Sequence, residues 1–92
     1  MKQEQNLHPL LKTWEDAGTT HLDVRPLLEV GGEPYAYIMD FVQAIQSGHP
    51  LVVHALFEPK PLIRQIARMG LTTRCWREAE DHWQLEISTG NP

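Results

Sequence analysis

Residues 51–57 form a nearly continuous apolar run close to the middle of the chain. An apolar run of this length is typical of an interior β-strand. Segments with helical periodicity of apolar residues flank it on both sides, at 34–48 and at 59–70. Prolines stand near the start of each segment and a glycine at its end, as is usual for helices. An interior strand between two amphipathic helices predicts a sheet whose parallel strands are joined by helical crossovers.

Three further strands are expected, at 21–25, 71–78 and 82–88. In the first of them Leu22 and Val24 alternate with polar residues, so its two faces differ in polarity. The element order is therefore β-α-β-α-β-β. Two right-handed crossovers in the same direction place both helices on the same side of the sheet. The sequence thus predicts an α/β (α+β) two-layer sandwich, with a four-stranded mixed sheet, two helices on one face and the other face open.

The chain of 92 residues is the size of one domain, which we place at 20–88. Residues 89–92 are expected to be a C-terminal tail and residues 1–19 an N-terminal tail. Within the N-terminal segment four apolar residues fall at helical spacing, which predicts a short amphipathic helix, whereas isolated helices of this length are marginal in water. Helix and frayed tail therefore both remain open. The four residues are Leu7, Leu10, Leu11 and Trp14.

Net charge, cysteine content and the lengths of the apolar stretches limit the partners and the location that we expect for this chain. The formal net charge is −4, which argues against nucleic acid as a partner, because nucleic-acid binding usually needs a basic face. The one cysteine, Cys75, cannot form an internal disulfide. The polar start does not resemble a signal peptide, and no apolar stretch is long enough to span a membrane. We expect a cytoplasmic protein that binds another protein or a small ligand and needs no cofactor; the sequence does not set its oligomeric state.

Three short motifs carry a resemblance to known families. The segment from Leu22 to Pro34 resembles the start of the TusA-like (SirA-like) sulfur carriers, and the closing residues 83–87 and the segment after the second strand resemble the domain-of-unknown-function family 2249, over about residues 20–88. The resemblance implies the same fold and a bacterial setting in redox, sulfur or nitrogen-oxide metabolism, often beside hemerythrin-like domains, with no established activity. The motif positions are Leu22, Asp23, Arg25, Glu33, Pro34, Glu58, Pro59, Pro61 and Leu62.

The chain departs from the sulfur carriers at the residue that does their chemistry. Those proteins hold a persulfide on a cysteine just before the first helix, where a thiolate is stabilised. Aligning the motifs places Gly31 at the cysteine position and Gly32 at the following proline. A sulfur relay would have to use Cys75 instead. Cross-strand pairing sets Cys75 beside Leu85 on the covered face, where cysteine behaves as a small hydrophobe.

Histidines on neighbouring strands suggest a second alternative. His21 and His54 lie close together if the first two strands are parallel neighbours, and a metal or haem site could use both, with or without His82. None of these residues has the close sequence spacing of a strong metal motif. Surface histidines without a metal are therefore the favoured interpretation.

The open face of the sheet is the main candidate for binding. Val52, His54, Leu56 and Trp76 are expected to point away from the helices. Arg74 and Glu86 form a plausible cross-strand pair beside them. Such a patch is either a binding surface or is covered by the N-terminal segment through Leu10, Leu11 and Trp14.

Catalytic motifs are not evident in the sequence: no serine or cysteine stands in a recognisable base-bearing motif, and no paired carboxylates share a suggestive spacing. The sequence therefore predicts a non-catalytic accessory or binding module that uses the open face and the loop 26–33. The alternatives remain a sulfur relay and a metal or haem protein.

Overall fold

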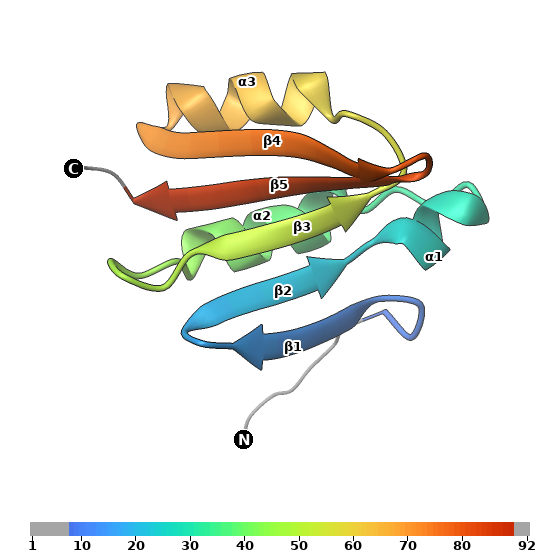
Figure 1. Cartoon of the computed structure of the whole chain (residues 1–92), viewed down its shortest axis with the longest axis horizontal. Coiled ribbons are helices and arrows are strands. Elements are labelled where there is room, and N and C mark those ends of the chain that lie inside the picture. The colour runs from blue at the N-terminus through green and yellow to red at the C-terminus, as the bar shows by residue number, and fades with distance from the viewer. Residues whose placement is uncertain (1–7, 90–92) are drawn as a thin grey trace.

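The computed structural model describes residues 8–89 and shows a single twisted sheet with helices packed on it (Figure 1). The sheet has five strands in the order β1-β2-β3-β5-β4. Strands β2 and β3 are parallel, and every other neighbouring pair is antiparallel. The elements are β1 (Lys12–Asp16), β2 (Thr19–Asp23), α1 (Arg25–Glu29), α2 (Tyr35–Gln43), β3 (Leu51–Ala55), α3 (Lys60–Arg68), β4 (Leu71–Ala79) and β5 (His82–Thr89).

The predicted class of a mixed sheet with helices on one face agrees with this architecture, but the predicted numbers of strands and helices are wrong. The additional strand is β1, which pairs with β2 through a two-residue turn at Ala17 and Gly18. Both turn residues have positive φ, 52° and 84°, as a type I′ hairpin turn requires. The expected helix near the N-terminus is therefore a strand over Lys12–Asp16, and Leu7 lies outside the described residues.

The additional helix is α1, in a segment that was expected to be a loop. Proline at its first turn fixes φ in the helical range. The backbone N–H groups of Gly31 and Gly32 donate to the carbonyl oxygens of Leu28 and Leu27, at 3.0 and 2.9 Å, and close the helix. These two amides are therefore not free to bind an anion.

Helices α2 and α3 cover one face of the sheet and bury a single core. In Figure 1, α2 lies behind β3 and α3 runs along β4. Helix α2 ends at Gln43, earlier than predicted, because a tight turn closed by the bridge between Gln46 and His49 follows it. The most deeply buried side chains are Leu22, Val24, Leu51, Val53, Ile66, Leu85 and Ile87.

Two further features of the fold bear on the predictions. Trp83 lies on the covered face of the sheet but is only half-buried, whereas Leu85 and Ile87 are buried. Trp83 stands opposite Ala55 at the end of β3, and the guanidinium carbon of Arg77 lies 6.0 Å from its ring centre. Within residues 8–89, no helix is long and apolar enough to cross a membrane.

Candidate functional site

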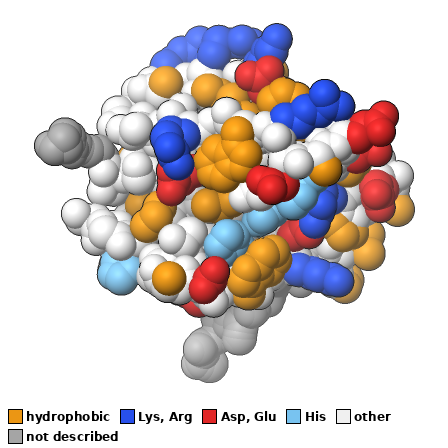
Figure 2. Space-filling view, in the orientation of Figure 1, with side chains coloured by type: hydrophobic (Ala, Val, Ile, Leu, Met, Phe, Trp, Pro, Cys, Tyr) orange, Lys and Arg blue, Asp and Glu red, His pale blue; other side chains and the backbone are white. Residues whose placement is uncertain are grey.

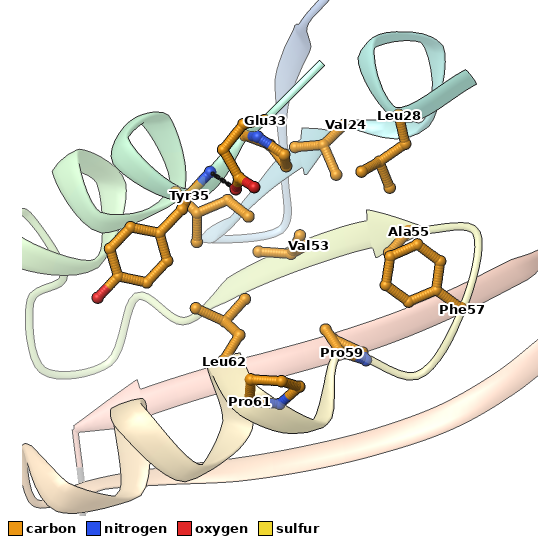
Figure 3. Close-up of a pocket in the computed structure, with 12 residues that line it drawn as sticks. Val24, Leu28, Glu33, Tyr35, Val53, Ala55, Phe57, Pro59, Pro61 and Leu62 are labelled. Carbon is orange, nitrogen blue, oxygen red and sulfur yellow. Dashed lines mark hydrogen bonds between the residues drawn. The ribbon is translucent and has the colours of Figure 1, made fainter. Parts of the chain in front are cut away.

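The helices α2 and α3 both begin at the edge of the sheet where the parallel strands β2 and β3 end. Ligands of α/β proteins commonly bind at the carboxyl ends of parallel strands. A pocket of about 510 Å³ opens at this edge, as Figure 3 shows. It is lined by Val24, Leu28, Glu33, Pro34, Tyr35, Ile38, Val53, Ala55, Phe57, Pro59, Pro61 and Leu62.

Apolar side chains make nearly the whole wall of this pocket. Its floor comes from the sheet, where Val53 and Ala55 are almost fully buried. Its mouth carries two aromatic rings, and the residues Tyr35 and Phe57 are 44% and 53% exposed. Exposed aromatic rings beside a deep apolar floor provide a surface for an apolar or aromatic group.

Glu33 is the one lining residue, among those described, that carries a charge at neutral pH. Its Oε2 atom accepts a hydrogen bond from the backbone N–H of Tyr35 at 2.9 Å (Figure 3). The carboxylate therefore caps the first turn of α2 and compensates the positive end of the helix dipole. Negative charge at the pocket disfavours anionic ligands and favours neutral or cationic ones.

The motif positions divide between the pocket and the structural framework. Five of them line the pocket, whereas Leu22 lies in the core. Asp23 accepts hydrogen bonds from the Arg25 backbone N–H and from its guanidinium, at 2.8–3.0 Å. Burial alone would raise the pKa of Asp23, but the hydrogen bonds and charge of Arg25 hold the pKa below its ordinary value. This pair fixes the turn from β2 into α1. The five pocket positions are Glu33, Pro34, Pro59, Pro61 and Leu62.

The open face of the sheet carries the predicted residues, but their exposure differs from expectation. Val52 and His54 are each only 5% exposed, and Leu56 and Trp76 are partly buried. The cross-strand pair forms as predicted, with Arg74 Nε 2.9 Å from Glu86 Oε1. The described part of the N-terminal segment covers this face only in part. Strand β1 extends the sheet sideways, and its Trp14 packs on the open face against His21 and His54, whereas Leu11 joins the core on the other side.

Three histidines form a row across this face, which we call the histidine row: His21 on β2, His54 on β3 and His82 on β5 (Figure 2). His21 Nδ1 lies 3.0 Å from His54 Nε2, and His54 Nδ1 lies 2.8 Å from His82 Nε2. Trp14 stacks on His21, with ring centres 5.0 Å apart and planes within 4°. The predicted proximity of His21 and His54 is therefore confirmed.

His54, in the middle of the row, is held neutral. Burial lowers its pKa to about 4, against the opposing charge of Asp23, and the charges of His82, His21 and Arg25 act in the same direction as burial. Its two ring nitrogens point to different neighbours, so the three imidazoles do not converge on one ion. Over the described residues, no group of three or more His, Cys, Asp or Glu side chains is placed to hold a metal. The geometry thus gives the metal hypothesis no support.

Cys75 lies opposite Leu85 on the covered face, in the predicted register. Burial raises the pKa of its thiol, and the Glu58 carboxylate raises it further. Less thiolate is then present at neutral pH, which disfavours nucleophilic sulfur chemistry. The position expected for a carrier cysteine is occupied by Gly31, two residues before the pocket residue Glu33.

Comparison with known proteins identifies a family. A family model described as "Uncharacterized conserved protein (DUF2249)" matches residues 21–89. The match covers the chain from His21 in β2 to the end of β5, so β1 precedes it. No curated protein and no solved structure matches the chain.

Proposed function

The chain belongs to the DUF2249 family of uncharacterized conserved proteins, and from the geometry of its pocket we propose that it is a non-catalytic binding module for a small apolar ligand. The observation that carries this proposal is the apolar pocket between the starts of α2 and α3. Its volume of about 510 Å³ lies within the range of small-molecule sites. The predicted loop 26–33 contributes Leu28 and Glu33 to its wall.

The lining residues favour binding over catalysis. None of those described is a histidine, cysteine, serine or lysine, the residue types that most often act as bases or nucleophiles. The carboxylate of Glu33 is already engaged with the backbone of Tyr35. A bound molecule would therefore be held by apolar contact and by the aromatic rings rather than transformed.

The charge of the pocket indicates the class of ligand. Glu33 makes the mouth negative, and the rings of Tyr35 and Phe57 present π-faces that attract cations as well as apolar groups. The proposed ligand is therefore a neutral or positively charged apolar molecule. An acidic metabolite or a phosphate ester would meet repulsion from Glu33 without a compensating basic side chain in the described wall.

Filling the pocket tests the proposal. Ala55 lines the pocket from β3, so Ala55→Leu should occupy part of its volume. The circular dichroism spectrum of the variant checks that it is folded. The matched control is Ala67→Leu on the exposed side of α3. With the neutral dye N-phenyl-1-naphthylamine as probe, we expect a fluorescence increase with the wild type and the control and a much smaller one with Ala55→Leu. Equal responses of the two variants would refute binding in this pocket.

A further inference from the structure

The histidine row crosses the three inner strands of the sheet. Strands β2, β3 and β5 each have a hydrogen-bonded neighbour on both sides. His21 and His54 are paired with both neighbouring strands, and His82 pairs with Ala79 where β5 begins. His54 is 5% exposed, and the Trp14 ring centre lies 5.2 Å from it, whereas His21 and His82 are partly exposed. The middle of the row is therefore shielded from water while its two ends are accessible.

The contacts in the row set how many protons it can hold. Each nitrogen–nitrogen contact needs one hydrogen between its two imidazoles. Three neutral rings carry one more hydrogen than the two contacts require, and it sits at one free end, on His21 Nε2 or on His82 Nδ1. An added proton fills the other end and leaves both contacts intact. A second added proton would put hydrogens on both nitrogens of one contact and break it.

We propose that His21, His54 and His82 form a proton relay across the open face of the sheet. A proton binds the bare nitrogen at one end, and in each contact the hydrogen leaves one imidazole and bonds to the next. The hydrogen at the far end is released to water or to a base on a molecule bound at this face. The row returns to neutrality with its tautomers reversed, and the next proton passes in the opposite direction; no group is oxidised or reduced.

The charged side chains near the histidine row either bond to other groups or lie at its two ends. Asp23 is engaged by Arg25, and Glu86 by Arg74. Glu78 accepts hydrogen bonds from the Trp76 and Gln84 side chains. The remaining charged groups that strand alternation or sequence places near the row lie at its two ends. They are Lys12 and Asp16 on β1, and Glu80 and Asp81 in the turn before His82.

The imidazole nitrogen resonances of the full-length protein labelled with ¹⁵N test the relay. In the wild type we expect both nitrogens of His54 to show signals averaged between the protonated and bare states, because both tautomers are populated. A single fixed tautomer of His54 at all pH values would overturn the relay.

A conservative variant separates a relay from a merely structural row. In His82→Gln the amide oxygen can still accept from His54 Nδ1, but it cannot pass a proton on. We expect the backbone spectrum to stay that of a folded protein while His54 becomes locked with its hydrogen on Nδ1. The control is His49→Gln, outside the row, which should leave the averaging unchanged. Averaging at His54 that persists in folded His82→Gln would contradict the proposal.

Discussion

Gly32 lies so close to the side chain of Leu27 that a Cβ atom at Gly32 would collide with it. Leu27 is buried in the core, so it cannot simply turn away. This contact sets the path of the chain from α1 to the start of α2, and with it the position of Glu33 at the pocket.

Gly32→Ala should therefore destabilise the fold, by about 1–3 kcal/mol as is typical of overpacking. Chemical denaturation measures the loss. The control is the same change in a Leu27→Ala background. The collision with the Leu27 side chain is then removed while the Leu27 carbonyl oxygen stays 3.1 Å from the added Cβ atom, so the cost should fall without vanishing. An unchanged cost in that background would show that the clash is not its cause.

The stability lost when side chains of the last two strands are truncated to alanine should depend on their burial rather than on their size. Leu85→Ala is expected to cost about 2–5 kcal/mol, the range for a buried leucine. Trp83→Ala should cost less than Leu85→Ala because Trp83 is only half-buried, and Trp76→Ala on the open face should leave the protein folded. Thermal unfolding of the three variants gives the order, and a larger loss for Trp83→Ala would contradict the described packing.

Stability should fall on acidification because of His54. Its pKa is about 4 in the folded protein and near 6.5 when unfolded, so between these values the unfolded chain binds more protons. Stability from this group is therefore complete above pH 6.5 and is lost progressively towards pH 4, by at most about 3 kcal/mol. Asp23, whose folded pKa is lowered, adds a further loss below the ordinary range of aspartate.

Denaturation midpoints measured from pH 7 to pH 4 test this dependence. His54→Gln should flatten the slope, and the exposed His49→Gln should not. A slope that stays the same in folded His54→Gln would assign the acid sensitivity to other groups.

The Cys75 thiol should react slowly. It packs against the core and its pKa is raised, so a disulfide reagent such as Ellman's reagent should modify the native protein far more slowly than the unfolded chain. Reaction as fast in the native state as in denaturant would reopen the sulfur-relay alternative.

The alternation of residues in the strands predicted the paired positions well. The Arg74–Glu86 pair and the contact of Cys75 with Leu85 follow from the turn before His82 and from side-chain alternation. The approach of His21 to His54 follows from parallel pairing of their strands. These are consequences of local periodicity, which a sequence displays directly.

The N-terminal strand could not be predicted by the same means. Leu10, Leu11 and Trp14 fit helical spacing, but hydrogen bonding to the edge of β2 satisfies the backbone of residues 12–16, and Leu11 joins the core. The sequence held one indication of a β-hairpin, which is the possible two-residue turn Ala17-Gly18 between two segments that contain threonine.

The pocket had no signal in the sequence beyond its two proline-bounded helix starts. Its lining comes from β3, from α1, from the starts of α2 and α3 and from the segments that precede these two helices, which are distant in the chain. A cavity depends on how far apart packed elements stand, and that distance is set by the whole core rather than by a local pattern.

The most direct test of the proposed binding function uses two adjacent valines. Val53 faces the pocket, and its neighbour Val52 faces the opposite side of the sheet. Methyl resonances should be followed during titration with N-phenyl-1-naphthylamine. The account predicts large shifts for Val53, Ile38 and Leu62 and negligible shifts for Val52. Shifts concentrated at Val52 and Leu56, or no shift at Val53, would contradict it.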